Sequence, residues 1–232
     1  MEIKNFENLI CREIDEVVNT IISNNRSINI SAKSRVGAEI SDWLETEFVK
    51  KATKHKYLKK TKAAPSGKTK NPWDVQTFFQ FNEHTEEIWI DFKALKKSSA
   101  DSNPDIGTPT KIIKFISSGN FYLLYIYVYY IESPTGLDFV KVNNSFTKSY
   151  FLKDISSTVR RNPKNQLQIN VSAKPEYRTR TDFIEMLINK IRESHFRQIE
   201  ISKKALNNID SIHSKMLKMN LQSEKTILDK IQ

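Results

Sequence analysis

Three side chains in the middle of the chain combine the two carboxylates and the ammonium group that metal-assisted phosphodiester hydrolysis uses. They are Asp74, Asp91 and Lys93. Carboxylate oxygens suit Mg²⁺, which keeps several of its waters and can accept a phosphate oxygen. Such an ion supplies an activated water and a Lewis acid, while a fixed ammonium group stabilises the developing charge. The residue types therefore predict catalytic roles for all three side chains, with Asp74 and Asp91 as the metal ligands.

The motif that Asp91-Phe92-Lys93 forms is weak by itself, because about two such triplets are expected by chance in a chain this rich in charge. The other triplet, Glu2-Ile3-Lys4, lies near a terminus, where chains tend to fray. The first lies in a segment whose alternate residues, from Ile88 to Ala94, are apolar. Side chains two residues apart on a strand share a face, so Asp91 and Lys93 lie together. The competing interpretation is an exposed surface ion pair.

Two strands position these residues, and they are predicted at 75–81 and 87–95 with a polar turn between them. If Phe81 pairs with Glu86 in a hairpin, counting back places Asp74 opposite Lys93. Opposed side chains lie about 5 Å apart and diagonal ones about 7 Å apart. The two carboxylates and the ammonium group then converge on one patch. Lengthening the turn by two residues would move the pairing but keep the same face.

The surrounding pattern predicts an α/β (α+β) fold, with a mixed central sheet flanked by helices and with further helices at the C-terminus. Apolar residues recur at helical spacing over 5–22 and 36–51, and Thr108 with Pro109 marks the start of a helix through residue 117. The apolar run 121–131 is typical of a buried strand parallel to an earlier one.

We expect residues 1–232 to form a single domain. Its core lies at about 36–131 and a C-terminal helical region at about 182–232. That region contains a heptad-like series, Ile209, Ile212, Met216 and Met219. Such a series serves either to join two copies of the chain or to pack a helix on its own domain, and the sequence leaves both uses open.

The charge of the chain indicates a polyanionic partner. Lys and Arg number 37 against 27 Asp and Glu, for a net charge of +10. Nine lysines and no acidic residue fall between Lys50 and Lys70, in a segment broken by a turn at Pro65-Ser66-Gly67. No apolar run is long enough for a spanning helix or a signal peptide, which favours nucleic acid over membrane. A single cysteine, Cys11, excludes an internal disulfide, and we expect a cytoplasmic protein.

Several basic and amide side chains are candidates for DNA contacts. Basic residues supply affinity and salt dependence, whereas Asn and Gln can read adenine in the major groove. Each candidate has a competing role as a loop former or a solvated charge. The candidates are Lys68, Lys70, Asn71, Lys96, Lys97, Asn103, Arg160, Arg161, Gln166, Gln168, Tyr177, Arg178 and Arg180, and Asp105 is either a DNA-side residue or part of a turn.

The spacing of Asp74 and Asp91-Phe92-Lys93 resembles the signature of the PD-(D/E)xK nucleases, although Trp73 separates the proline from the aspartate. Longer stretches resemble the SwaI-type type II restriction endonucleases, which cut an eight-base-pair palindrome made only of A and T. The similar stretches are RVGAEISDWLETEFVK (35–50), KTKNPWD (68–74), EEIWIDFKALK (86–96), DSNPDIGTPTKIIKFISSGNFYLLYIYVYY (101–130) and YRTRTDFIEMLINKIRESHFRQIE (177–200).

This resemblance implies a homodimer that uses Mg²⁺ to break both strands of DNA, and a cognate DNA methyltransferase that is not a stable partner. It also implies metal-binding roles for Asp74 and Asp91, a water-positioning role for Lys93 and an accessory acidic role for Glu39. An exposed helix residue is the competing interpretation of Glu39. Two other classes of protein remain: a structure-specific repair or junction nuclease with the same core, and a basic DNA-binding protein without catalysis.

Overall fold

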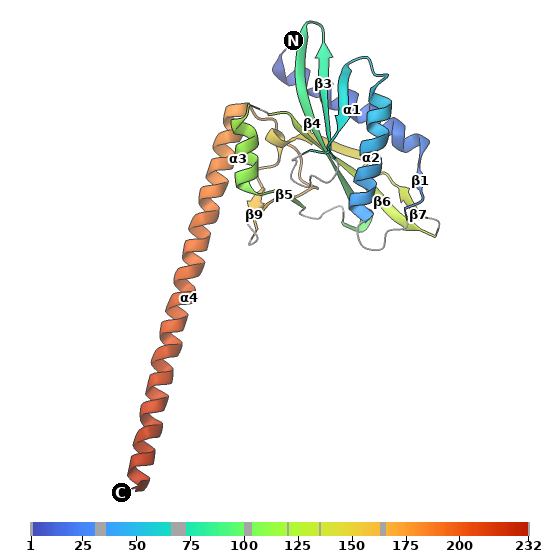
Figure 1. Cartoon of the computed structure of the whole chain (residues 1–232). Helices are drawn as coiled ribbons and strands as arrows, with labels where there is room; N and C mark the ends of the chain where they lie inside the picture. The colour runs from blue at the N-terminus through green and yellow to red at the C-terminus, as the bar shows by residue number, and fades with distance from the viewer. Residues whose placement is uncertain are drawn as a thin grey trace. The chain divides into compact units, whose positions relative to one another are not determined.

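The computed structural model describes residues 2–30, 36–65, 73–99, 104–119, 121–134, 136–162 and 166–231 (Figure 1). Contacts divide the chain into two compact units, residues 1–186 and 187–232. The helices are α1 (Ile3–Asn24), α2 (Val36–Ala52), α3 (Pro109–Ser117) and α4 (Arg180–Ile231). The strands are β1 (Ser27–Ile28), β2 (Leu58–Ala63), β3 (Val75–Phe81), β4 (His84–Lys96), β5 (Asp105–Gly107), β6 (Leu123–Ser133), β7 (Gly136–Phe139), β8 (Thr147–Phe151), β9 (Arg160–Arg161) and β10 (Leu167–Gln168), with 3-10 turns at Lys97–Ser99 and Leu152–Asp154.

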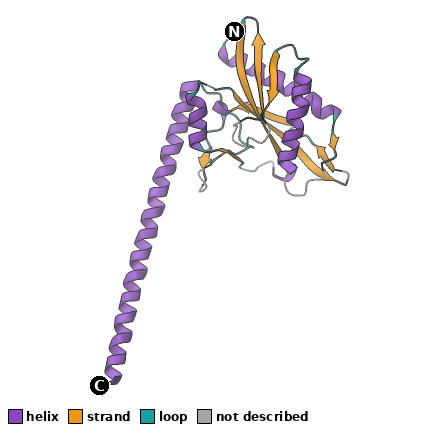
Figure 2. Cartoon of the chain, in the orientation of Figure 1, coloured by secondary structure: helices purple, strands orange, loops and turns teal. Residues whose placement is uncertain are grey.

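A seven-stranded mixed sheet forms the centre of the first unit, with strand order β1-β7-β6-β4-β3-β2 and β8 paired to β6 (Figure 2). Strands β4 and β6 are parallel, and the other pairs are antiparallel. The crossover between β4 and β6 contains α3, as expected for a parallel connection. The predicted mixed sheet with helices is therefore confirmed.

Helices α1 and α2 cover one face of this sheet because each carries a stripe of apolar residues at helical spacing. The stripe of α2 reaches the sheet through Phe48, whose ring meets that of Phe92 edge-on at 5.7 Å. Phe6 of α1 meets Phe79 of β3 in the same way at 5.8 Å. Burial of these rings fixes which residues of β4 turn inward, so Asp91 and Lys93 must face the other side of the sheet.

The other face of the sheet carries α3 and a three-stranded sheet of order β5-β10-β9. Helix α3 begins as predicted, because the side-chain hydroxyl of Thr108 accepts a hydrogen bond from the backbone N–H of Lys111 at 3.3 Å. Phe115 of α3 packs on Trp89 of β4 with ring centroids 4.8 Å apart. The hydroxyl of Tyr125 on β6 donates to the carbonyl oxygen of Ile106 at 3.3 Å, which ties β5 to the central sheet.

Two expectations about the strands need correction. Phe81 pairs with His84 and not with Glu86, because the turn is only Asn82-Glu83 and Asn82 adopts a positive φ of 55°. The shorter turn moves the pairing by two residues and keeps the faces as predicted. In addition, the lysine-rich segment contains a strand that the sequence analysis did not predict: Leu58–Ala63 forms the edge strand β2, where lysines discourage pairing with another chain.

The predicted C-terminal helices are a single uninterrupted helix, α4, of 52 residues. Its residues 180–186 belong to the first unit, and the rest of the helix makes up the described part of the second unit. Every residue from 195 to 231 is exposed. Along the described residues, no helix combines the length and the apolar character that crossing a membrane requires.

Candidate active site

Asp91 and Lys93 lie side by side on the α3 face of β4. The Nζ atom of Lys93 donates to the carboxylate of Asp91 at 2.8 Å. Both side chains are partly shielded, with 33% of the Lys93 side chain and 13% of the Asp91 side chain exposed. Partial burial makes the pair stronger than the surface ion pair that was the competing interpretation.

Asp74 reaches the same place from the beginning of β3. The pairing of Val75 with Ile90 brings Asp74, the preceding residue, opposite Asp91 and not opposite Lys93. The backbone N–H of Asp74 donates to the carbonyl of Ile90 at 2.8 Å, and its carboxylate accepts a 2.7 Å hydrogen bond from the backbone N–H of Phe92. The Asp74 carboxylate therefore accepts a hydrogen bond that a backbone carbonyl of the neighbouring strand would otherwise accept. This bond holds the carboxylate beside Asp91.

The carboxyl group of Asp74 lies where nearby groups offset its negative charge only in part. Burial and the nearby charge of Asp91 raise its pKa to about 7, against the lowering effects of the Phe92 N–H and Lys93. For Lys93, burial lowers the pKa, but attraction to Asp91 and the hydrogen bond to it outweigh burial, so the net pKa is raised. Lys93 is therefore a protonated, fixed cation at neutral pH.

A pocket of about 280 Å³ contains all three side chains. Its floor is the central sheet, including Tyr125 of β6, and its walls come from β5, α3 and the segment before β10. The polar side chains along it are Asp74, Asp91, Lys93, Asp105, Lys111 and Gln166. The pocket brings positive and negative groups together around a space large enough for a phosphate group and several waters.

A divalent cation with hard oxygen preferences fits the Asp74 and Asp91 pair. Their two carboxylates lie together, and because burial and the charge of Asp91 raise the pKa of Asp74, a cation bound between them would stabilise its ionised form. Among the described residues, no group of three or more His, Cys, Asp or Glu side chains could hold a metal. Two carboxylates suit Mg²⁺, which fills its other positions with water and phosphate oxygens.

Glu39 is not brought to this pocket. It is an exposed residue in the first turn of α2, and α2 packs on the opposite face of β4, where the hydroxyl of Ser41 donates to the Phe92 carbonyl at 3.0 Å. Glu39 is absent from the described pocket lining. Its accessory role stays a prediction from the resemblance.

The predicted DNA contacts divide into three groups: residues outside the described part of the chain, residues on or beside strands of the two sheets, and the segment from Tyr177 to Arg180. Lys68, Lys70, Asn71 and Asn103 lie outside the described residues. Arg160 and Arg161 form β9, which joins β5 through β10 at the side of the pocket, and Gln166 lines the pocket itself. Lys96 lies at the far end of β4, where it pairs with Glu132 at 3.0 Å.

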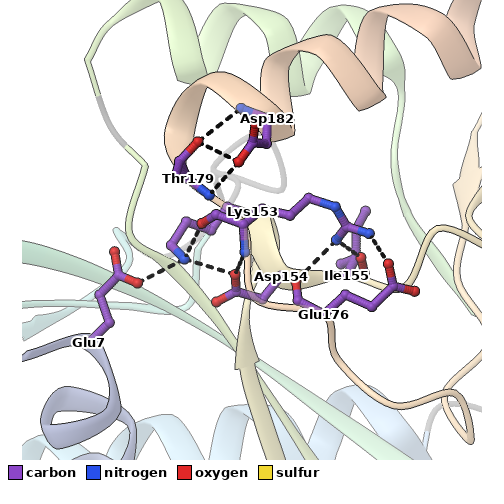
Figure 3. Close-up of polar contacts among 8 residues, drawn as sticks. Glu7, Lys153, Asp154, Ile155, Glu176, Thr179 and Asp182 are labelled. Atoms are coloured by element: carbon purple, nitrogen blue, oxygen red, sulfur yellow. Dashed lines mark hydrogen bonds and ion pairs between the residues drawn. The ribbon is translucent and has the colours of Figure 1, made fainter. Parts of the chain in front are cut away.

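The third group is the segment from Tyr177 to Arg180. Figure 3 shows the polar contacts of residues in and around this segment, among them Lys153, Glu176 and Thr179. The guanidinium of Arg178 bonds the side chain of Glu176 and the carbonyl of Ile155, and only 10% of its side chain is exposed. Lys153, which is buried, donates to the carbonyl of Arg178 at 2.8 Å. Arg178 therefore holds this segment in place, although it remains a predicted DNA contact.

The two neighbours of Arg178 differ in their surroundings. Tyr177 is 42% exposed and lies under the ammonium groups of Lys4 and Lys153. The guanidinium of Arg180 lies 5.0 Å from the ring centroids of Phe121 and Tyr122. Arg180 lines a second pocket, of about 770 Å³, with the hairpin turn and the start of α1, and not the pocket of Asp74 and Asp91.

Lys111 and Tyr125 line the active-site pocket, but sequence reasoning did not identify them. A signal for Lys111 was present, since it lies in the first turn of the helix that connects two strands of the catalytic sheet. Tyr125 was hidden within a uniformly apolar run. Asp105 belongs to strand β5 and not to a turn, and its carboxylate accepts a 2.9 Å hydrogen bond from the side chain of Asn162.

Comparisons with known proteins identify the fold and the family of this chain. The solved structure of NlaIV restriction endonuclease is similar to 82% of this chain and 80% of its own, with a TM-score of 0.50 and 14% sequence identity, which shows a shared fold. A search of curated proteins finds no match. A family model described as SwaI-like, SwaI restriction endonuclease, matches residues 2–209. The chain belongs to the SwaI-like family of restriction endonucleases, and its fold is that of a restriction endonuclease.

Proposed function

We propose that this protein is a Mg²⁺-dependent type II restriction endonuclease of the PD-(D/E)xK kind that breaks both strands of DNA at a palindromic octamer made only of A and T, such as ATTTAAAT. The observation that carries the proposal is the convergence of Asp74, Asp91 and Lys93 in one pocket of a chain from this family. The octamer rests on the resemblance to SwaI-type enzymes alone.

Each of the three side chains has a distinct role in this proposal. Asp74 and Asp91 would hold the metal, and the Phe92 N–H would orient the Asp74 carboxylate toward it. A bound Mg²⁺ supplies a Lewis acid and lowers the pKa of its water. Lys93, protonated and fixed by Asp91, orients the attacking water and offsets the negative charge that develops on the phosphate.

A palindromic target requires a two-fold arrangement of protein subunits, so we propose that the enzyme acts as a homodimer on duplex DNA. We treat residues 1–232 as one functional endonuclease, with the chemistry in the first unit. The net charge of +10 supports attraction to the DNA backbone. Restriction also implies a separate cognate methyltransferase and action in the cytoplasm, where host DNA must be protected.

A plasmid cleavage assay tests the proposal. Two plasmids that differ only in one ATTTAAAT site are incubated with the enzyme in Mg²⁺, with Mg²⁺ removed by a chelator, and with the Asp91→Ala variant. We expect one linear product from the plasmid with the site, only with wild-type enzyme and Mg²⁺. Nicking of both plasmids would instead indicate a structure-specific nuclease, and binding without any cutting would indicate a DNA-binding protein.

A further inference from the structure

The second half of α4 exposes an apolar seam. Five residues in consecutive three- and four-residue steps form it: Ala205, Ile209, Ile212, Met216 and Met219. All five are exposed, including 58% of Ile209 and 71% of Met219. A repeat of seven residues with two apolar positions is the pattern by which one helix packs along another.

Charge is distributed around the helix in a way that leaves this seam nearly neutral. Between residues 197 and 227 the helix carries nine charged side chains, counting Lys, Arg, Asp and Glu. Only Lys215 lies beside the seam, and the other eight lie on the outward positions of the heptad. DNA binding needs positive charge at the contact, so this face does not fit DNA.

The seam is also narrow. The six residues that flank it are Leu206, Asn208, His213, Lys215, Asn220 and Gln222, and five of them are polar. A helix that packs on a globular domain or lies in a membrane surface presents a wider apolar face, whereas a two-position stripe is the seam of a coiled coil. The partner that fits is therefore another helix with a similarly narrow, neutral seam.

A second copy of this chain supplies such a helix. Two molecules with a net charge of +10 repel each other, so a surface that joins them must be one where charge is scarce. Isolated helices are marginal in water, and pairing would bury the seam residues of both copies. The inference deepens the proposed function, since it rests on the proposed homodimer and names a surface that holds it together.

We propose that α4 self-associates along the Ala205–Met219 seam and joins two copies of the chain. The family model ends at residue 209, so most of the seam lies beyond the stretch that defines the family. Self-association through this seam would therefore involve residues outside the stretch that the family model matches.

A pair of matched double variants of the full chain tests the seam. Ile212→Glu/Met219→Glu changes two seam residues one heptad apart, which are 48% and 71% exposed. Leu221→Glu/Leu228→Glu changes two outward residues with the same spacing, which are 65% and 61% exposed. Both variants add the same charge to one helix. Sedimentation equilibrium without DNA or metal measures the molar mass over a range of protein concentrations.

We expect the wild type and the outward variant to sediment as dimers, with twice the 27.0 kDa of one chain. The seam variant should have a dissociation constant raised by at least about 100-fold, because pairing would bury four unpaired carboxylates. A wild type that is monomeric at all concentrations, equal dimerisation of the two variants, or equal loss in both would overturn the proposal.

Two further measurements separate this outcome from unfolding and from failure of the proposed function. Hydrogen exchange of the wild type should show protection of residues 205–219 that increases with protein concentration, and protection that is independent of concentration would contradict self-association. Plasmid cleavage by the wild type is scored separately. A dimer that does not cut would reject the proposed function and leave the seam intact, whereas a cutting dimer unaffected by the seam variant would reject only the seam.

Discussion

At the scale of single residues, we expect the protonation of Asp74 to control metal binding, because a carboxyl group must lose its proton to become a ligand. Its pKa is raised to about 7 by burial and by Asp91. At limiting Mg²⁺, we expect the cleavage rate to fall as the pH drops below about 7. Raising Mg²⁺ tenfold should move the midpoint to lower pH, by up to about one pH unit. A midpoint that does not respond to Mg²⁺ would show that a different group titrates.

The same raised pKa has a cost for stability that depends on pH. Because the folded-state pKa of Asp74 lies above the ordinary value of 3.8, folding disfavours its ionised form. The penalty is absent below pH 3.8, grows as the pH rises and is complete above about 7. Asp74→Asn should therefore raise the thermal midpoint of the metal-free protein at pH 8 but not at pH 4. An equal gain at both pH values would point to packing instead.

Lys93 should matter for the rate of chemistry and little for DNA binding. Lys93→Ala removes the fixed cation of the pocket, and we expect the single-turnover cleavage rate to fall by at least about 10³-fold. Lys96→Ala is the matched control, since it removes the same charge three residues further along β4, where the partner is Glu132. Single-turnover rates at saturating enzyme, with affinities measured in Ca²⁺, distinguish the two effects. Similar rates for both variants would exclude Lys93 from the chemistry.

At the scale of elements, the sequence predicted the helices and the long strands well, because their periodicity reports which face is buried. The register of the β3–β4 hairpin was not predictable from the alternation of apolar residues, because that alternation is the same for turns that differ by two residues in length. Asn82-Glu83 is also not the Asn-Gly pair that marks a two-residue turn most clearly. The error in register left the predicted faces of β3 and β4 unchanged. Asp74, Asp91 and Lys93 were therefore still predicted to lie together.

The walls of the site were harder to foresee. Strands β5 and β9 contain three and two residues, too few to show any alternation. The pairing of β5 with β10 joins Gly107 to Leu167, which are distant in the sequence. In β2 the lysine run hid the strand, since Leu58 is the only buried residue among the six. Sequence reasoning therefore predicted which three side chains converge and missed most of what encloses them.

The buried face of β4 should dominate the contribution of this strand to the stability of the first unit. Phe92 is 1% exposed and packs against Phe48 of α2. Phe92→Ala should reduce the free energy of unfolding of the first unit by about 3 to 5 kcal/mol, because apolar burial is reduced and a cavity remains. Phe78→Ala, at a half-buried position of β3, should cost less. Urea unfolding measures both, and equal costs would mean that Phe92 is not a core residue.

At the scale of the whole molecule, affinity for DNA should depend on salt through the lysine-rich segment. We expect Lys68→Ala/Lys70→Ala to flatten the plot of log affinity against log salt by about 0.9 for each phosphate that the variant no longer neutralises. Lys203→Ala/Lys204→Ala removes the same charge from exposed positions of α4 and should leave the slope nearly unchanged. Slopes measured by fluorescence anisotropy decide this, and a wild-type slope for the first variant would assign its lysines to solvent.

The way the site is divided between near and distant parts of the chain bears on when activity arises during synthesis. Asp74 and Asp91 belong to one hairpin, whose contacts are local and form early. The pocket wall needs β5 to pair with β10, about sixty residues later in the chain. A nascent chain therefore acquires the carboxylate pair before the enclosure that would hold a phosphate beside it. We expect the nuclease to become competent only late in its synthesis, which limits the exposure of unprotected host DNA to unfinished enzyme.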